Sequence, residues 1–446
     1  MKLSCGSRHS PKPRAEVKVS VKSDSQAKQI TICVREIDLD QMTQASFYQS
    51  EQFVQQIVNQ IGKELTLEML RRRDCDQPTI EHKGRTWYRK EASNASYQTL
   101  YGGVTLARHL YQTSAGGPTR CPMEEHCQLS FGGATPLLAE TLSFKVSAMT
   151  PGEASQDLAK HGLQLSSSFI RETAQKVGRI AIEKATAWQL QAPSPETRVE
   201  VVATGLDGTT MPLRGEDYKE AMCGTIALYD KRAERLSTEY LGAMPESGKA
   251  DFTKRFTARV AQVLARYPNA LHVVLSDGAI WNWQLIKEQY PEAIWILDFW
   301  HAAQHLAQAA DLIFGGAQSE EKSVWFERWK KALRDDPDGV AGVIRTLLYY
   351  RNRAKLSATA RKEPDAQLNY FRSHADKMQY ADYVAAGLPI GSGVTEAGCK
   401  ELIKARFCRS GMRWNRGSGA KVLQLRAIRL SAQWDSFWSR VMRYAA

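Results

Sequence analysis

The stretch VEVVATGLD, residues 199–207, decides the fold. It is an apolar run of strand length, and apolar side chains on both faces are typical of a strand buried within a sheet. The run ends in a single acidic residue, Asp207. A lone carboxylate at the end of a buried strand is costly to desolvate unless a partner compensates its charge. The sequence therefore predicts a partner for Asp207, and several such acids together favour a divalent cation.

The segments that follow alternate between strands and helices. Two runs, EAMCGTIALYD (220–230) and ERLSTEYLG (234–242), predict strands, and residues 249–267 predict a helix. The order continues as strand, helix, strand, helix, with LHVVLSD (271–277), WNWQLIKEQY (281–290), AIWILD (293–298) and FWHAAQHLAQAADLIF (299–314). This β-β-β-α-β-α-β-α order is that of the RNase H-like fold, an α/β fold in which a mixed sheet carries helices on both faces.

Three acids occupy positions that such a fold would bring together. Its first strand is central and its fourth lies beside it, so we expect Asp207 and Asp277 to project from neighbouring strand ends at one sheet edge. Glu396 follows a long insertion and enters a helix that Thr395 is expected to cap. Three carboxylates suit two Mg²⁺ (or Mn²⁺) ions about 4 Å apart, because these ions prefer oxygen ligands. Either Asp alone could be a turn residue before its glycine, but their arrangement with Glu396 favours the metal pocket.

The charge of the chain indicates a nucleic-acid partner. Its 446 residues are too many for one compact core, and 60 Lys and Arg against 48 Asp and Glu give a net charge of +12. Residues 396–446 contain eleven Lys or Arg and three Asp or Glu. Such runs are usually solvated helix faces, but this one begins beside a candidate catalytic acid, which favours a phosphate-contacting surface. A basic protein that gathers acids around metal ions is most simply an enzyme that cuts or joins nucleic acid.

Composition also predicts the compartment. No stretch of about 18 uncharged apolar residues occurs, and the first 20 residues lack the apolar core of a signal peptide, so we expect a cytoplasmic protein without a membrane span. The eight cysteines are scattered without a CxxC pair, which indicates reduced thiols. Cys121, His126 and Cys127 lie close in sequence, but their spacing is incomplete for tetrahedral zinc, so a polar loop is favoured.

The N-terminal part is expected to be a separate α+β region, residues 1–150. Apolar residues at three- and four-residue steps predict a helix at 41–73. Residues 80–112 change to alternation, which indicates an antiparallel pair of strands with Gly102 and Gly103 between them.

Residues 151–198 are expected to form a helical segment and a linker. A first helix, a tight turn and a second helix capped by Ser166 or Ser167 have the layout of a helix-turn-helix. The second helix would carry basic side chains into a major groove: Arg171, Lys176 and Arg179. A plain helical hairpin is an equally good interpretation. QAPSPETR (191–198) is a linker by composition.

The chain resembles the bacterial insertion-sequence transposases of the DDE type, in particular the Kra-type group, which is more distantly related to the Mutator-like transposases. The resemblance rests on four stretches between residues 200 and 446, of which the last is long and specific. They are GLDGTTM (205–211), LSDGAIWNW (275–283), ILDFWHAAQHL (296–306) and LPIGSGVTEAGCKELIKARFCRSGMRWNRGSGAKVLQLRA (388–427).

The resemblance implies that Asp207, Asp277 and Glu396 are the first, second and third catalytic acids. Asp298-x-x-His301 matches a signature that follows the second acid in Mutator-like enzymes, and His305 extends it by one helical turn on the same face. A hydrogen-bond cluster that orients the pocket is favoured there over a further metal site. If the fifth strand bends inward, Asp298 rather than Asp277 would be the second metal ligand.

Basic residues after Glu396 would contact DNA, since arginine forks suit phosphate oxygens. They are Lys404, Arg406, Arg409, Arg413 and Arg416. Trp414 could stack on an unpaired base at a transposon end, and a packing role for it is equally supported.

We therefore expect a DNA transposase that hydrolyses a phosphodiester at the element end and joins the 3′-hydroxyl to target DNA, acting as a dimer. Its catalytic core would comprise residues 199–301 and 386–446, separated by a helical insertion at 302–385. The alternatives are a host-adopted DNA-binding regulator and an RNase H-like nuclease without strand transfer. Intact acids argue against the regulator, and the insertion and the long C-terminal motif argue against the simple nuclease.

Overall fold

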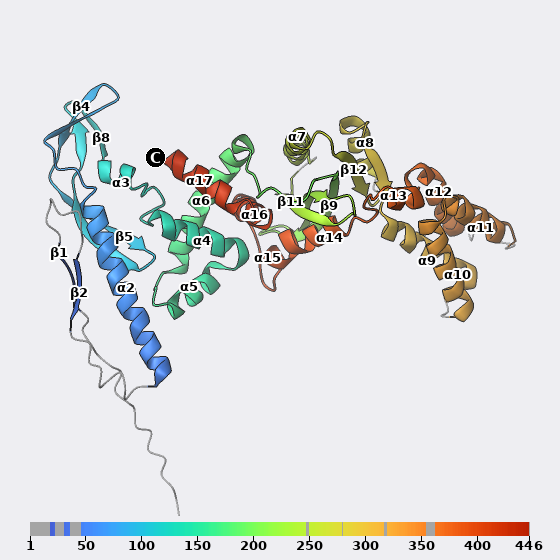
Figure 1. Cartoon of the computed structure of the whole chain (residues 1–446), viewed down its shortest axis with the longest axis horizontal. Coiled ribbons are helices and arrows are strands. Elements are labelled where there is room, and N and C mark those ends of the chain that lie inside the picture. Colours follow the sequence, from blue (N-terminus) through green and yellow to red (C-terminus); the bar gives the residue numbers. More distant parts are fainter. Residues whose placement is uncertain are drawn as a thin grey trace, which may run out of the picture. The chain divides into compact units, whose positions relative to one another are not determined.

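A five-stranded mixed sheet, in the order β11-β10-β9-β12-β13, dominates the computed structural model (Figure 1). The first three strands along the chain are antiparallel, and the last two run parallel to β9. The strands are β9 (Val201–Pro212), β10 (Tyr218–Tyr229), β11 (Arg235–Ala243), β12 (Leu271–Ser276) and β13 (Ile294–Leu297). The predicted order of strands is confirmed, and the central position of β9 follows from its pairing with both β10 and β12.

The structure describes residues 18–22, 31–35, 46–246, 249–278, 280–315, 319–353 and 362–445. The chain folds as two compact units, one of residues 1–180 with 438–446 and the other of residues 181–437. The larger unit contains the five-stranded sheet and all the acids discussed above. No helix in the described part of the chain is both long and apolar enough to cross a membrane.

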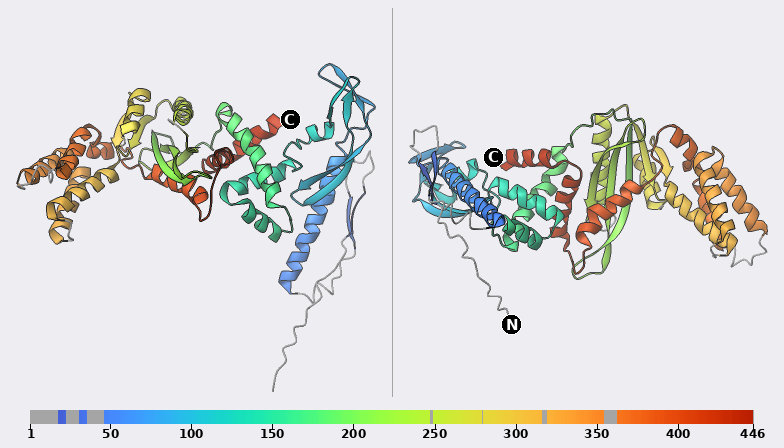
Figure 2. Two further views of the ribbon diagram at one scale, coloured as in Figure 1. Left: turned by 180° about the vertical axis from the view of Figure 1, so that it is seen from behind. Right: turned by 60° about the horizontal axis from the view of Figure 1, so that its bottom comes forward.

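Alternate residues of β9 face two different layers. Val202 and Leu206 pack with the helices α7 (Ala250–Arg266) and α8 (Ile280–Gln289). Val201 and Ala203 belong to the core that includes α9 (Phe299–Phe314). Because side chains alternate along a strand, Asp207 shares a face with Val201 and Ala203 rather than with Leu206. The same face is contacted by the helices at residues 393–404 (Figure 2, right view).

The segment between β13 and the C-terminal helices is a bundle (Figure 1). Its helices are α9, α10 (Glu320–Asp335), α11 (Gly339–Arg353), α12 (Lys362–Ser373), the short 3₁₀-helix η1 (Ala375–Lys377) and α13 (Tyr380–Ala385). All regular elements in the described residues of 302–385 are thus helical, as predicted. Helix α9 begins at Phe299 and continues through residue 302, where the insertion was expected to begin.

The C-terminal helical segment returns to the sheet after the bundle. It consists of α14 (Gly393–Gly398), the π-helix η2 (Cys399–Lys404), α15 (Ala405–Phe407) and α16 (Arg416–Leu430). The last helix, α17 (Trp434–Ala445), belongs for the most part to the smaller unit. Helix α14 contacts β9 and β10, and α16 contacts β11. The π-helix was not predicted from the sequence; it lies directly after the helix that carries Glu396, and such bulges are frequent at functional sites.

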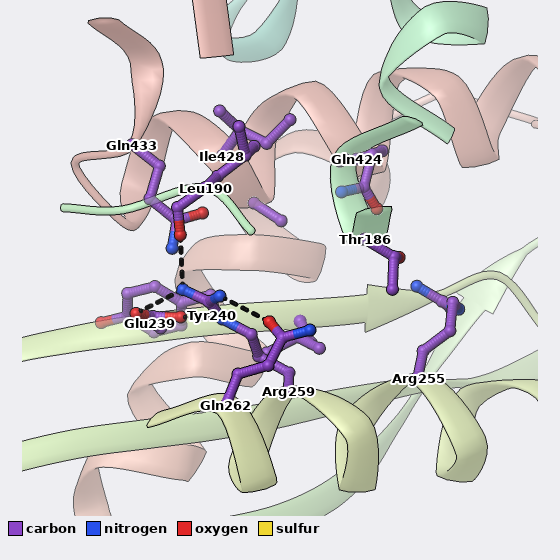
Figure 3. A pocket seen from close by; sticks show the side chains of 13 residues that line it. Thr186, Leu190, Glu239, Tyr240, Arg255, Arg259, Gln262, Gln424, Ile428 and Gln433 are labelled. Carbon is purple, nitrogen blue, oxygen red and sulfur yellow. Dashed lines mark hydrogen bonds and ion pairs between the residues drawn. The ribbon is translucent and has the colours of Figure 1, made fainter. Parts of the chain in front are cut away.

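A small cavity of about 60 Å³ lies between β11, α7 and α16 (Figure 3). Arg259 bridges it: its guanidinium bonds to Glu239 of β11 at 2.7 and 2.9 Å, to Gln262 and to the Leu190 carbonyl at 2.6 Å. Through Leu190, these bonds tie the segment between α6 (Ser167–Trp188) and the linker to the sheet. Arg259 therefore fixes the start of the linker. Residues 191–198 themselves have no regular secondary structure, as expected.

The smaller unit, whose bounds differ from the expected region at 1–150, combines short strands and helices. It contains β1 (Lys18–Lys22), β2 (Thr31–Arg35), α2 (Phe47–Arg71), β3 (Thr79–His82), β4 (Arg85–Arg89), β5 (Ser93–Thr99), β6 (Gly102–Arg108), β7 (Tyr111–Thr113), β8 (Gly116–Arg120), α3 (Pro122–His126), α4 (Pro136–Ala148), α5 (Pro151–Lys160) and most of α6. Residues 41–45 of the predicted helix lie outside the described residues. The predicted strand pair is corrected: β5 pairs with β6, β4 pairs with β3 and β7, and Gly102 and Gly103 begin β6 instead of separating two strands.

Candidate active site

One pocket brings together the three acids predicted from the sequence. It has a volume of about 280 Å³ and lies where β9, β12, α9 and α14 meet. Its walls are Leu206, Asp207, Leu275, Ser276, Asp277, His301, Gln304, Ser392, Thr395 and Glu396. Carboxylates from three separate segments thus line a single hollow at the sheet.

Asp207 lies inside strand β9 and does not end it, which corrects the sequence prediction. The register pairs Asp207 with Cys223 and Gly208 with Met222, and β9 continues to Pro212. The Asp-Gly dipeptide is therefore extended strand rather than a turn. The half-buried carboxylate accepts hydrogen bonds from the Gly208 amide at 2.6 Å and from the Cys399 thiol at 3.4 Å.

Asp277 follows β12, the parallel neighbour of β9, as predicted. Asn282 of α8 holds it in place. The Asn282 amide nitrogen donates to Asp277 Oδ1 at 3.3 Å and lies 3.4 Å from the Leu206 carbonyl of β9. Asn282 is only 2% exposed. The sequence analysis missed this residue, although an Asn within the apolar run IWNWQLI of a helix was a signal that it has a buried partner.

Close packing at glycines brings Glu396 to the pocket. A methyl group on Gly205 of β9 would overlap the Thr395 hydroxyl, and one on Gly398 of α14 would lie 2.9 Å from Cys223 Sγ. Thr395 is buried within α14, and its hydroxyl is 2.7 Å from that of Thr225. The predicted cap is therefore wrong: Thr395 joins α14 to β10, and the helix instead begins after Ser392 without a side-chain cap.

Asp298 and His301 have different positions relative to the pocket. Asp298 is fully buried and does not line it; its carboxylate caps α9 by accepting the His301 amide at 2.7 Å and also accepts the Ser392 amide. Burial alone would raise the pKa of Asp298, but the contacts with His301 and Ser392 lower it below its usual value. His301 lines the pocket, and its Nδ1 lies 3.3 Å from Asp298 Oδ1.

The pKa of His301 reflects the acids around it. The contact with Asp298 raises the pKa of His301, burial opposes this effect, and the negative charges of Asp277 and Glu396 add to it. His305, one turn further along α9, is turned to other partners: its Nδ1 bonds to Gln367 Oε1 at 2.8 Å and its ring stacks on Tyr370. The predicted cluster therefore contains Asp298 and His301 but not His305.

Some polar atoms beside this pocket are buried without a hydrogen-bond partner. Among the described residues they include Asn282 Oδ1 and Tyr370 Oη. Buried polar atoms are nearly always partnered, so each exception calls for a water, an ion or a functional role. Asn282 Oδ1 and Tyr370 Oη are therefore available to a further hydrogen-bond partner next to the carboxylates.

The donor set of the pocket fits a hard divalent cation, because carboxylate oxygens are the ligands that Mg²⁺ and Mn²⁺ prefer. In the described part of the chain, however, no three His, Cys, Asp or Glu side chains converge tightly enough to form a ready metal cluster. This holds for the three acids and also for Cys121, His126 and Cys127. Burial raises the pKa of both Cys121 and Cys127, which favours the uncharged thiol.

The basic residues after Glu396 fall into two groups. Lys404, Arg409 and Arg413 are exposed. Arg406 is only 1% exposed, with its guanidinium 5.0 Å from the centre of the Trp414 ring, so its predicted contact with DNA is wrong.

Two further predicted DNA contacts are engaged within the protein. The Trp414 indole donates to the Phe407 carbonyl at 3.1 Å, and its backbone bonds to Arg214 and Pro212 at the tip of the β9–β10 hairpin. Arg416 forms a bidentate ion pair with Glu216 and also donates to the Pro245 carbonyl at 3.0 Å. These contacts favour the packing role for Trp414, and they make Arg416 a link between α16 and the hairpin.

The predicted helix pair in the smaller unit is present. α5 and α6 are separated by a short turn, and the Ser166 hydroxyl accepts the Phe169 amide at 3.2 Å, so Ser166 is the cap. The three basic residues singled out on α6 are all exposed: Arg171, Lys176 and Arg179. Their contact with DNA stays a prediction.

Comparisons with known proteins add little to this geometry. No family model matches the chain, and no curated protein matches it. A weak likeness joins it to a chain in the Drosophila P element transposase strand transfer complex, at 9% identity and a TM-score of 0.27, over 70% of this chain and 81% of that one. A TM-score this low says nothing about mechanism, and the geometry of the pocket is the basis for assigning a function.

Proposed function

We propose that the chain is a metal-dependent DNA transposase of the DDE type, with Asp207, Asp277 and Glu396 as its catalytic acids. The observation that carries the proposal is their convergence. The three acids come from the centre of β9, from the end of β12 and from α14, and they line one pocket. Residues so far apart in sequence share a pocket because β9, β12 and α14 meet there.

The topology of the sheet supports an RNase H-like core. Three antiparallel strands are followed by two strands parallel to the first, which gives the order 3-2-1-4-5. The first acid is on the central strand, and the second follows its parallel neighbour. Polar groups at the carboxyl ends of neighbouring parallel strands are where open sheets bind substrates.

Mg²⁺ or Mn²⁺ would be held by Asp207, Asp277 and Glu396, and would supply activation of a water or 3′-hydroxyl and stabilisation of the leaving oxygen. The protein's own groups fix these acids. The Gly208 amide and the Cys399 thiol hold Asp207, and Asn282 holds Asp277. His301 lines the same pocket, and its raised pKa favours the imidazolium form, which would suit a phosphate.

The exposed cations Lys404, Arg409 and Arg413 are the proposed contacts to the DNA backbone near the pocket. Lys404 is the last residue of η2, and Arg409 and Arg413 lie in the loop between α15 and α16. The Cys408 thiol at the start of this loop lies 3.6 Å from the Thr210 carbonyl of β9. Because β9 also carries Asp207, this contact anchors the basic loop to the strand of the first acid. We further propose that the exposed face of α6 contacts the transposon end, and that the protein acts as a dimer on DNA.

The test uses the DNA that flanks the gene. Labelled duplexes that carry the element's ends are incubated with the protein, Mg²⁺ and a supercoiled plasmid, and joined products are counted. A transposase cuts at the element end and joins that end to the plasmid. Cutting without joining would indicate a nuclease instead, and binding without cutting would indicate a regulator.

A further inference from the structure

Tyr370 of the helical bundle reaches the loop that carries the second acid. A Cβ built on Gly278 would lie 3.5 Å from the Tyr370 hydroxyl oxygen. Gly278 follows Asp277 directly and has a φ of 101°, a conformation that a glycine adopts without strain. The hydroxyl therefore lies against the backbone next to Asp277, although it comes from α12.

The Tyr370 hydroxyl is buried, and it has no hydrogen-bond partner. Leaving a hydroxyl unpaired in the interior is unfavourable, and a ring that could turn its hydroxyl toward water would be more stable. An orphaned donor retained beside a carboxylate pocket is therefore best explained by a partner that comes within reach when the pocket binds its ligand.

The ring has little freedom to move away. His305 stacks on it with 3.5 Å between ring centroids, Phe371 packs edge-on against it at 5.7 Å, and His374 lies at 5.0 Å. His305 is itself fixed by its hydrogen bond to Gln367. Burial and the charges of Asp277 and Asp298 raise the pKa of Tyr370, so the hydroxyl stays protonated and available as a donor at neutral pH.

We propose that Tyr370 is a positioning residue for Asp277: its hydroxyl donates a hydrogen bond to this carboxylate, directly or through one water, when the pocket binds its divalent cation. The inference rests on the proposed function. It gives the helical bundle a direct role at the pocket. Two helices would then hold the second acid, α12 through Tyr370 and α8 through Asn282. Partners of this kind orient metal-binding carboxylates and typically change metal affinity 10- to 100-fold.

Tyr380 provides a matched control from the same bundle. Its hydroxyl is also buried, but it donates to the Leu297 carbonyl at 3.0 Å. Tyr380→Phe removes a hydrogen bond that the protein already makes, so it should lower the melting temperature. Tyr370→Phe removes a hydroxyl without a partner, so the melting temperature in the absence of metal should be unchanged or slightly raised.

The experiment measures Mn²⁺ binding by thermal unfolding of the full-length chain at increasing Mn²⁺ concentrations, which requires no DNA step. We expect Tyr370→Phe to weaken the apparent Mn²⁺ affinity about tenfold and Tyr380→Phe to leave it unchanged. Equal affinities for the wild type and Tyr370→Phe would overturn the inference and leave the metal site standing. No Mn²⁺ effect on the wild type, with Asp207→Asn behaving identically, would overturn the proposed function and this inference with it.

Discussion

Single glycines determine where the third acid lies. Gly205 has no side chain at the point where Thr395 of α14 meets β9, and Gly398 has none where α14 meets Cys223 and Thr225 of β10. The helix can therefore sit directly on the strands, and Glu396 reaches the hollow beside Asp207. The position of the acid thus depends on residues that carry no chemistry of their own.

Gly205→Ala should lower the free energy of unfolding by about 1–3 kcal/mol, because the added methyl forces α14 away from a packed strand. Thr395→Ala should itself be destabilising, since it leaves the Thr225 hydroxyl unpaired. In the double variant the methyl has room, so its cost should be smaller than the sum of the single costs, as measured by denaturant unfolding. Gly417→Ala in α16, where no atom lies within 4 Å of an added Cβ, is the control and should be neutral or stabilising. Additive costs would contradict the packing argument.

Asp277 and Asp298 should respond differently to the same chemical change. Asp298→Asn removes a fully buried charge that caps α9 and binds the Ser392 amide, so it should cost about 1–3 kcal/mol of stability. Asp277→Asn should change stability little and abolish Mn²⁺ binding. Thermal unfolding of both variants with and without Mn²⁺ separates the roles. If Asp298→Asn alone lost the metal effect, Asp298 would be the second ligand.

At the scale of elements, local patterns predicted most of the sheet and failed where pairing is long-range. The apolar runs that became β10 to β13 were visible because buried strands have few polar residues. The end of β9 was misplaced because Asp207-Gly208 is a turn signal, whereas pairing with β10 keeps it extended as far as Pro212. Likewise, the burial of Arg406 against Trp414 and the approach of Tyr370 to Gly278 depend on contacts between distant segments, which charge and periodicity cannot reveal.

A histidine between the paired strands β12 and β9 predicts how stability depends on pH. His272 of β12 lies 3.1 Å from the Thr204 hydroxyl of β9 and edge-on to Tyr290, and burial lowers its pKa to about 4. The unfolded chain therefore binds a proton that the folded chain does not bind between about pH 6.5 and 4, so acidification should destabilise the protein in this window by about 3 kcal/mol and no further below it. In His272→Gln this part of the pH dependence should be missing from urea unfolding curves. An unchanged curve would show that His272 is not buried as described.

For the whole molecule, the distribution of positive charge should control DNA affinity. Lys404, Arg409, Arg413 and Arg416 are all exposed, and Arg416 forms an ion pair with Glu216. Replacing the first three by Gln should weaken DNA binding and reduce the slope of log affinity against log salt by about 2–3, since each lost phosphate contact removes about 0.9. Arg416→Gln should alter this slope much less. Fluorescence anisotropy with a labelled duplex measures both, and an unaltered slope in the triple variant would move the DNA-binding surface elsewhere, first to Arg171, Lys176 and Arg179 of α6.

The central claim is that Asp207 and Glu396 act chemically through a bound cation and not through DNA binding. The most direct measurement is Mg²⁺-dependent cleavage and joining of element-end duplexes by Asp207→Asn and Glu396→Gln, with DNA affinity measured on the same preparations. An amide keeps the shape of each side chain and loses the charge that would hold the metal. We predict that both variants bind DNA with nearly wild-type affinity and neither cut nor join it. Retained cleavage in either variant would contradict the account.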